Sequence, residues 1–349
     1  MAIRNDVNRQ WVLKNRPPGP IQADTFELRE TQIPTPGPGE ILIRNLWLSF
    51  DPAQRGWLND IRSYIAPVQI GEPMRAGSVG QVIESNHPDF KPGNLVQGAF
   101  GWQDYIATKP AGMLPVTKLP PGVPPNMALS ILGLTGLTAY FGMLDIGEPK
   151  PGQTVVVSSA AGATGSAAGQ IAKIKGAANV IGIAGGKDKC AWLTREAHFD
   201  AAIDYKNEDV AQRLGALAPK GIDIYFDNVG GEILKACLNR IAFHGRVVLC
   251  GGISSGYGAD RLSVSALSNY VMLLINSARM EGFIVLNYVA RYPEAVAQLA
   301  QWVKEGRIAY REDIAEGLEN APETLKRLFV GANFGKQLMK IADPLLPVA

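Results

Sequence analysis

The chain has 349 residues, with 34 Lys and Arg against 32 Asp and Glu, and three cysteines. At roughly 100–200 residues per domain, this length favours two domains over one. A formal net charge of +2 without a run of like charges argues against a nucleic-acid partner or a basic membrane-binding helix, so we expect a small-molecule ligand.

The three cysteines are Cys190, Cys237 and Cys250, an odd number without a C-x-x-C pair. This pattern excludes a disulfide framework and a four-sulfur zinc site. The polar first ten residues contain no apolar core of a secretory signal, and no window reaches about 18 uninterrupted apolar residues. We therefore expect a cytoplasmic protein without a membrane segment.

Proline-rich turns separate short β-like runs in the first 125 residues. The runs cover residues 40–47, 78–84 and 94–98. Strands of this length between Gly and Pro turns predict a β-rich or barrel-like domain, and a set of loops is the alternative.

From about residue 126, apolar runs alternate with stretches of helical length. This alternation predicts right-handed βαβ units and a doubly wound parallel sheet. The predicted strands are 154–158, 180–184, 202–205, 222–226 and 246–250, and the predicted helices are 165–176, 187–197, 207–217 and 231–242.

A helix-like stretch at 292–305 closes this region, and two shorter runs follow at 308–314 and 335–341. The last runs are too few to form a domain of their own, so we expect them to return to the β-rich domain. We place the β-rich domain at 1–130 and 306–349, and the Rossmann domain at 131–305.

A glycine-rich loop joins the strand at 154–158 to the next helix. Residues Ala160 to Gly165 have the pattern A-x-G-x-x-G. The glycines allow the backbone to approach a pyrophosphate, and the helix N-terminus presents unpaired N–H groups and a positive dipole end to it. The loop therefore predicts a dinucleotide cofactor.

Residues 183–189, Ile-Ala-Gly-Gly-Lys-Asp-Lys, indicate which nicotinamide cofactor is bound. Small residues leave room where an NAD site places an acid against the ribose 2′-hydroxyl, and Lys187 and Lys189 attract a 2′-phosphate by a few kcal/mol. This favours NADPH. In the alternative, both lysines are solvated residues at a helix start and Asp188 contacts the 2′-hydroxyl.

A catalytic zinc needs about three ligands, but the predicted β-rich domain has no cysteine within 1–130 and one histidine, His87, in a turn-like segment. His198 and His244 flank predicted strands and are interpreted as structural. Hydride transfer without a metal suits conjugate reduction, because neutral donors can stabilise the enolate oxyanion. A tyrosine hydroxyl is such a donor. These residues predict a reductase of activated double bonds.

Ten short motifs occur in order along nearly the whole chain: 8–10 (NRQ), 48–52 (LSFDP), 84–88 (ESNHP), 101–105 (GWQDY), 136–140 (GLTAY), 160–166 (AAGATGS), 226–231 (FDNVGG), 302–305 (WVKE), 317–322 (GLENAP) and 333–336 (NFGK). With these motifs the chain resembles the zinc-independent medium-chain dehydrogenase/reductases, in the branch of leukotriene B4 dehydrogenase, prostaglandin reductase and bacterial NADPH-dependent curcumin reductase. The resemblance implies a GroES-like domain completed by the C-terminal tail, a Rossmann domain and, commonly, a homodimer.

The resemblance also implies the residues that contact NADPH. Gly162, Ala163, Thr164 and Gly165 match the pyrophosphate loop, and Lys189 and Tyr205 match the 2′-phosphate contacts. The remaining implied cofactor contacts are Asn228, Cys250, Gly251, Gly252, Ile253, Ser254, Ser255, Gly256, Phe283, Ile284, Val285 and Asn333.

Two tyrosines are the candidate catalytic residues. Tyr257 follows the fifth predicted strand of the parallel sheet at its ligand-binding end and resembles the family's active-site tyrosine, although Gly256 separates it from Ser255 where relatives have no such insertion. A loop tyrosine is the alternative. Ala53 stands where relatives often have a tyrosine, and Tyr64 either supplies that ring from nearby or packs within the domain.

The expected function is NADPH-dependent reduction of the C=C bond of an α,β-unsaturated ketone or aldehyde, a small-molecule substrate. No metal, nucleic acid or membrane partner is expected. The alternatives are a quinone oxidoreductase on the same scaffold and an NADPH-binding protein without turnover.

Overall fold

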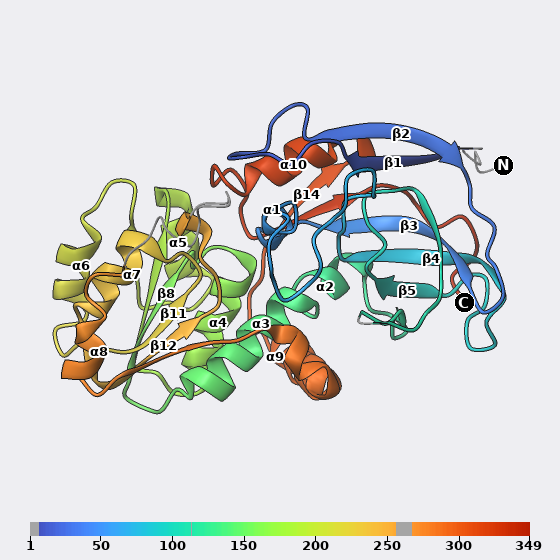
Figure 1. Ribbon diagram of the computed structural model, residues 1–349. Coiled ribbons are helices and arrows are strands. Elements are labelled where there is room, and N and C mark those ends of the chain that lie inside the picture. Colours follow the sequence, from blue (N-terminus) through green and yellow to red (C-terminus); the bar gives the residue numbers. More distant parts are fainter. Residues whose placement is uncertain (1–6, 113, 256–266) are drawn as a thin grey trace.

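The structure is a computed structural model that describes residues 7–112, 114–255 and 267–349. Figure 1 shows two lobes, one built mainly of antiparallel strands and one of a parallel sheet between helices. Together they confirm the predicted combination of a β-rich domain and a doubly wound α/β domain.

The first lobe contains a seven-stranded sheet and a separate hairpin. The last strand of the chain, β15, pairs antiparallel with β3, with Leu338 opposite Ser49. Leu338 and Met339 are fully buried there, which explains why the C-terminal segment returns to the N-terminal sheet. The sheet consists of β14 (Glu312–Glu316), β15 (Lys336–Lys340), β3 (Ile41–Ser49), β4 (Ser78–Ser85), β5 (Leu95–Gly98) and β7 (Thr117–Lys118) in spatial order, with β6 (Tyr105–Thr108) on β3, and the hairpin of β1 (Val7–Leu13) and β2 (Phe26–Gln32).

Short helices lie around this sheet. The red segment that carries β14 and α10 runs beside the blue N-terminal strands in Figure 1. The helices are α1 (Ala53–Gly56), α2 (Pro125–Leu129), the 3-10 turn η5 (Leu318–Asn320) and α10 (Ala321–Arg327).

The second lobe has a six-stranded parallel sheet whose strands, numbered along the chain, lie in the order 3-2-1-4-5-6. This is the Rossmann order, in which the direction of the strand order reverses between β8 and β11. The strands in space are β10 (Ala201–Asp204), β9 (Asn179–Ala184), β8 (Thr154–Ser158), β11 (Ile222–Asp227), β12 (Ile241–Leu249) and β13 (Arg279–Gly282).

Helices cover both faces of this sheet, so the strands are buried on both sides. Val155 and Val157 pack into one apolar cluster with α4 and α9, whereas Val156 packs into a second cluster on the opposite face with α6 and α7. The helices are α3 (Leu134–Phe141), the π-helix η1 (Gly142–Gly147), α4 (Ala163–Ile174), α5 (Lys187–Arg195), α6 (Val210–Leu217), α7 (Gly231–Leu238), the 3-10 turn η2 (Ile253–Ser255), α8 (Val271–Ile275), the 3-10 segment η4 (Val285–Arg291) and α9 (Tyr292–Lys304).

The predicted helices differ from the observed ones by a few residues at their ends, and the structure explains two of these differences. The helix predicted at 231–242 ends at Leu238, because Ile241 begins β12 and pairs with Ile222 of β11. The helix predicted at 207–217 begins at Val210, because the Asp209 carboxylate accepts a hydrogen bond from the Gln212 N–H and caps it. Among the described residues, no helix is long and apolar enough to cross a membrane.

Candidate active site

Two neighbouring cavities of about 670 and 640 Å³ lie at the carboxyl ends of β8, β11 and β12. They meet at the point where the strand order reverses, which is the usual ligand site of an open parallel sheet. We call them the inner cavity, which extends to the β-rich lobe, and the outer cavity, which extends to α5. Both are lined by Ser159, Gly162, Ile253, Leu328 and Asn333.

The glycine-rich loop forms the floor between these cavities. Helix α4 begins at Ala163, Gly162 stands at its N-cap, and no side chain caps its first turn. The N–H groups of that turn are therefore available to an anion, and the helix dipole favours negative charge there. A Cβ atom at Gly165 would overlap the carbonyl oxygen of Ser159, so this close turn requires glycine.

Cationic side chains gather at the far end of the outer cavity. Lys189 lies there and donates a hydrogen bond from Nζ to the carbonyl oxygen of Gly331 at 2.8 Å. Burial lowers the pKa of Lys189, and the nearby charge of Lys206 lowers it further. Tyr205 and Lys206 line the same space, whereas Lys187 is exposed on α5 and is not among the lining residues.

The outer cavity separates the predicted 2′-phosphate contacts that line it from those that lie outside it. Of the two lysines, Lys189 faces the cavity together with the predicted Tyr205, and Asp188 is exposed outside it. Sequence reasoning missed Lys206, although a lysine directly after the third strand of the sheet is a signal that could have found it. Gly185 lies against the Tyr205 ring, and a Cβ atom there would come within 2.9 Å of it. The absence of a side chain at this position agrees with the space for a 2′-phosphate that the small residues predicted.

Asp227 holds together the strand ends under the inner cavity. Its side chain is fully buried, and Oδ1 accepts hydrogen bonds from the Tyr225 hydroxyl at 2.7 Å and the Gly230 N–H at 2.8 Å. Its carbonyl oxygen accepts one from the Cys250 N–H at 2.9 Å. Ser158 Oγ, at the end of β8, also donates to Oδ1 at 3.2 Å. Burial raises the pKa of Asp227. Asp227 thus joins the ends of β8 and β11 through its carboxylate and the residue after β12 through its backbone carbonyl.

The other predicted cofactor contacts lie around the same floor. Asn228 donates from Nδ2 to the Ser158 carbonyl oxygen at 2.7 Å, and Asn333 donates from Nδ2 to the Gly335 carbonyl oxygen at 3.0 Å. Burial raises the pKa of the Cys250 thiol to about 12, so the thiol is protonated at neutral pH. The inner cavity is lined by Gly162, Ala163, Thr164, Gly165, Asn228, Cys250, Gly251, Gly252, Ile253, Phe283, Ile284, Val285 and Asn333, and the outer one by Ser254.

Three predicted residues lie wholly or partly outside the described part of the structure. Ser255 ends η2, and its side chain is not described. Gly256 and the candidate catalytic Tyr257 lie outside the described residues.

Phe50, Trp57 and Tyr64 of the β-rich lobe, with Leu134 at the start of α3, form an apolar wall of the inner cavity. The Tyr64 hydroxyl accepts a hydrogen bond from Trp57 Nε1 at 3.0 Å, and the guanidinium carbon of Arg75 lies 5.6 Å from the centre of the Trp57 ring. Ala53 and Tyr64 both line this cavity. Sequence reasoning did not identify Trp57.

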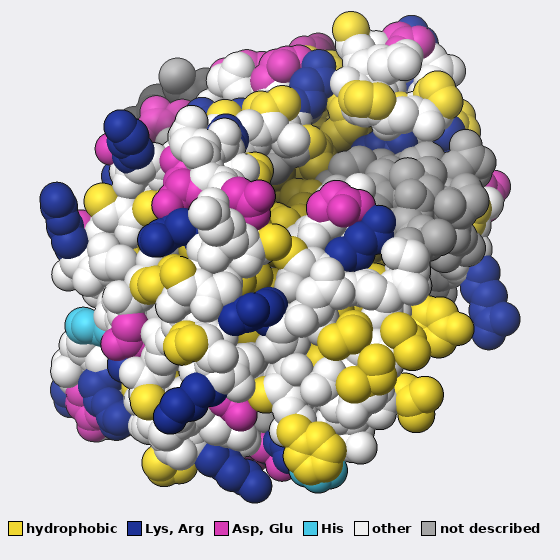
Figure 2. Space-filling model, turned by 90° about the vertical axis from the view of Figure 1, so that its left-hand side faces the viewer, with side chains coloured by type: hydrophobic (Ala, Val, Ile, Leu, Met, Phe, Trp, Pro, Cys, Tyr) yellow, Lys and Arg dark blue, Asp and Glu magenta, His cyan; other side chains and the backbone are white. Residues whose placement is uncertain are grey.

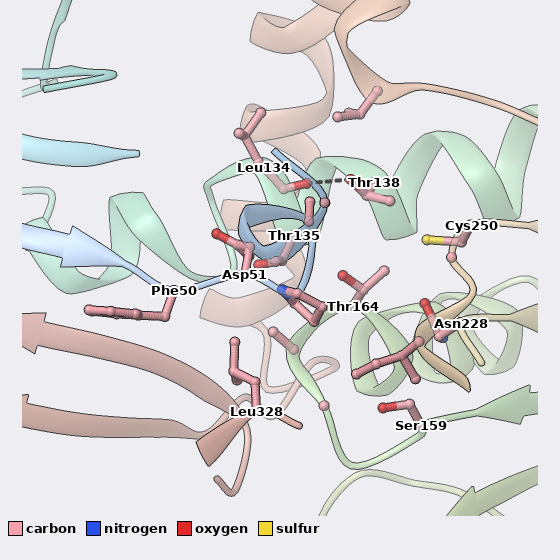
Figure 3. Close-up of a pocket in the computed structure, with 18 of the residues that line it drawn as sticks. Phe50, Asp51, Leu134, Thr135, Thr138, Ser159, Thr164, Asn228, Cys250 and Leu328 are labelled. Atoms are coloured by element: carbon pink, nitrogen blue, oxygen red, sulfur yellow. Dashed lines mark hydrogen bonds between the residues drawn. The ribbon is translucent and has the colours of Figure 1, made fainter. Parts of the chain in front are cut away.

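Asp51 and Lys336 complete this wall. Figure 3 shows Asp51 among the labelled lining residues, between Phe50 and Thr164. Its Oδ1 lies 2.5 Å from Lys336 Nζ, in an ion pair that joins β15 to the end of β3. Both residues belong to motifs quoted above, but no sequence pattern indicates that they are in contact.

Metal ligands do not gather anywhere in residues 7–112, 114–255 and 267–349: no group of three or more His, Cys, Asp or Glu side chains there could hold a metal ion.

The chain is similar to known proteins over nearly its full length. Residues 9–116 match a family described as the N-terminal domain of oxidoreductase, and residues 163–303 match one described as zinc-binding dehydrogenase. The NADPH-dependent curcumin reductase of Escherichia coli is 42% identical over 98% of this chain and 99% of that protein. The NADP(+)-dependent 2-alkenal reductase of Nicotiana tabacum is 38% identical over 96% and 98%. The crystal structure of CurA from Vibrio vulnificus in complex with NADPH has 42% identity and a TM-score of 0.89, over 96% of this chain and 100% of that one.

Proposed function

The chain belongs to the zinc-independent medium-chain dehydrogenase/reductase family, and from that premise we propose that it reduces the C=C bond of α,β-unsaturated ketones or aldehydes. It is an oxidoreductase, and its cofactor is NADPH. The observation that carries the proposed reaction is an inner cavity with apolar walls and a neutral hydroxyl donor, described below.

The two cavities fit this cofactor. The uncapped first turn of α4 and the loop from Gly162 to Gly165 suit a pyrophosphate. Lys189 and Lys206, with Tyr205 beside them, suit a 2′-phosphate. We propose that Asn228, Asn333 and the segments 250–254 and 283–285 hold the rest of the molecule. When bound, NADPH supplies the hydride of the reaction.

The inner cavity offers a neutral hydroxyl group to a substrate carbonyl. The Thr164 hydroxyl lines it, whereas the hydroxyls of Thr135 and Thr138 on the same wall donate hydrogen bonds to the carbonyl oxygens of Ser130 and Leu134. Conjugate reduction places negative charge on an enolate oxygen, and one or two neutral donors in a site that excludes water stabilise such an oxyanion. The walls formed by Phe50, Trp57 and Leu134 exclude water from that region. This combination supports reduction of the double bond over reduction of an isolated ketone.

We assign two roles to the candidate tyrosines. Tyr64 forms part of the wall against which the substrate packs, with its hydroxyl fixed by Trp57. Tyr257 donates a hydrogen bond to the substrate oxygen, an assignment that rests on its position after β12 in the sequence.

The test is NADPH oxidation with a panel of an enone, an enal, a quinone and a saturated ketone, with the products identified by mass spectrometry. We expect the enone and enal to give saturated ketone and aldehyde. Turnover of the quinone alone would favour a quinone oxidoreductase, and NADPH binding without any turnover would favour a binding protein. Either result would overturn the proposal.

We also propose that two copies of the chain form a dimer through β13. Within the described residues, β13 pairs only with β12 and stands at the edge of the sheet. Antiparallel pairing of two copies about Met280 would place Arg279 of each opposite Glu281 of the other, so the edge is complementary to itself. Figure 2 shows hydrophobic side chains gathered at this end of the molecule, where Leu274 and Ile275 of the neighbouring α8 are exposed.

Light scattering coupled to gel filtration tests the dimer. We expect Glu281→Arg to weaken it and the double variant Arg279→Glu/Glu281→Arg to restore it, because the second change re-forms the opposed pairs. A monomer in the unmodified protein, or equal effects of the single and double variants, would contradict this interface.

A further inference from the structure

Lys336 places a buried charge at the junction of the two lobes. Its side chain is 3% exposed, and Nζ lies 2.5 Å from Asp51 Oδ1 and donates to the Phe50 carbonyl oxygen at 2.9 Å. Asp51 Oδ2 accepts a hydrogen bond from Ser49 Oγ at 2.6 Å. The Asp51 side chain is 27% exposed, and both members of the pair line the inner cavity. The member of the pair that is accessible from the cavity is therefore the Asp51 carboxylate.

The pair also lies next to the cofactor loop. Gly335, directly before Lys336, donates its backbone N–H to the carbonyl oxygen of Ala161 at 3.1 Å. Figure 3 shows Asp51 on the side of the pocket that faces Thr164, the second residue of α4. A charge at Asp51 is thus located where the substrate wall and the cofactor loop meet.

Among the described residues that line the inner cavity, Asp51 and Lys336 are the only Asp, Glu, Lys or Arg. Opposite charges in contact cancel for a group farther away, so these residues together present no net charge to a substrate. If one member is removed, the remaining charge acts in a space with apolar walls, where water screens it poorly.

We propose that the Asp51–Lys336 pair determines substrate specificity, by keeping this wall neutral and so favouring uncharged enones over enones that carry a carboxylate. The inference rests on the proposed function. Asp51→Asn leaves the Lys336 charge uncompensated and attracts a substrate carboxylate. Lys336→Met leaves the Asp51 charge uncompensated and repels it. The double variant is neutral again.

The test compares 4-phenyl-3-buten-2-one with its 4-carboxyphenyl analogue, as the ratio of the two kcat/KM values. We expect Asp51→Asn to shift this ratio at least about tenfold toward the carboxylate, Lys336→Met to shift it away, and the double variant to return it to the original value. A purely structural role would lower both kcat/KM values together and leave their ratio unchanged.

Lys340→Met is the matched control. Lys340 lies on the same strand and changes the net charge equally, but its Nζ pairs with Asp343 at 2.7 Å and it is not among the residues that line the cavity. We expect this variant to leave the ratio unchanged.

The same preference is measured without turnover, as the ratio of Kd values of the NADPH-loaded protein for 4-phenylbutan-2-one and its 4-carboxyphenyl analogue. A shift in this ratio for Asp51→Asn supports the inference even if neither enone is reduced. Absence of reduction would overturn only the proposed function. Unchanged ratios in Asp51→Asn, or a shift of equal size in Lys340→Met, would overturn the inference.

Discussion

Gly335 donates its backbone N–H to the carbonyl oxygen of Ala161 at 3.1 Å, and so bonds the last strand segment of the β-rich lobe to the glycine-rich loop of the other lobe. Gly335 also forms an isolated parallel β-bridge with Gly162, the residue after Ala161. This contact makes the loop that faces the proposed pyrophosphate a shared element of both lobes.

The first prediction concerns Gly335. Its φ is +79°, and a Cβ atom there would overlap the carbonyl oxygen of Arg311. We expect Gly335→Ala to lower the free energy of unfolding by more than the roughly 1–2 kcal/mol that a left-handed conformation alone costs. It should also raise the KM for NADPH, because the cofactor loop shifts.

Gly306→Ala is the control for this change. Gly306 has a φ of +68° but open space around its Cβ position. Denaturant unfolding of both variants measures the difference. Equal losses of stability would show that the contact with Arg311 contributes nothing beyond the backbone conformation.

The second prediction separates two lysines on α5. Lys189→Met should raise the KM for NADPH about 10- to 100-fold and leave the KM for NADH nearly unchanged, because only NADPH carries the 2′-phosphate. Lys187→Met removes the same charge from an exposed position and should change neither value more than about twofold. Steady-state kinetics with both cofactors measures this. Equal effects of the two substitutions would contradict the role of Lys189.

The third prediction concerns Asp204, at the end of β10. Its carboxylate accepts hydrogen bonds from the Gly186 N–H at 2.8 Å, Asn207 Nδ2 at 2.7 Å and the Lys206 N–H at 3.1 Å. The bond from Gly186 has the largest part in lowering the pKa of Asp204 below 3.8. A carboxylate whose pKa is lower in the folded than in the unfolded protein stabilises the fold. This stabilisation is complete at a pH above the pKa of the unfolded state and is lost as the pH falls through the pKa of the folded state.

Asp204→Asn should therefore cost about 1.5–3 kcal/mol at neutral pH. Its difference from the unmodified protein should shrink as the pH falls below 3.8. Urea unfolding over this pH range measures the effect. Asp209→Asn is the matched control, because asparagine caps α6 as well as aspartate does. A difference for Asp204→Asn that is independent of pH would contradict the assignment.

The fourth prediction distinguishes the tyrosines. Tyr257→Phe should lower kcat more than it raises KM, because the hydroxyl acts on the charge that develops during reaction. Tyr64→Phe keeps the ring of the wall and should retain most of kcat, whereas Tyr64→Ala should raise the KM of the enone. Unchanged turnover in Tyr257→Phe would remove Tyr257 from the mechanism.

Local patterns predicted the parts of the fold that depend on neighbouring residues. The β-branched run at Thr154–Ser158 and the glycines after it correspond to β8 and the start of α4. The end of α7 was predicted four residues too late, because Ile241 pairs with Ile222 and no local signal shows that pairing. Strand β13 was not predicted either, since two of its four residues are charged and it lies at a sheet edge.

The residues of the candidate site likewise include some that local sequence patterns predict and some that they do not. The loop at Gly162 to Gly165 follows from a strand, a turn and a helix in sequence, so its place at the cavity could be anticipated. The contact between Asp51 and Lys336 joins residues 285 positions apart and depends on how β15 pairs with β3. No spacing rule connects such residues, and only the folded sheet brings them together.

The proposed reaction transfers a hydride to the β-carbon of an enone. It is tested most directly with NADPH that carries deuterium at both C4 positions and 4-phenyl-3-buten-2-one, followed by mass spectrometry and NMR of the product. We predict 4-phenylbutan-2-one with one deuterium at the β-carbon and an intact carbonyl group. Deuterium on a carbinol carbon, or none transferred to the product, would contradict this reaction.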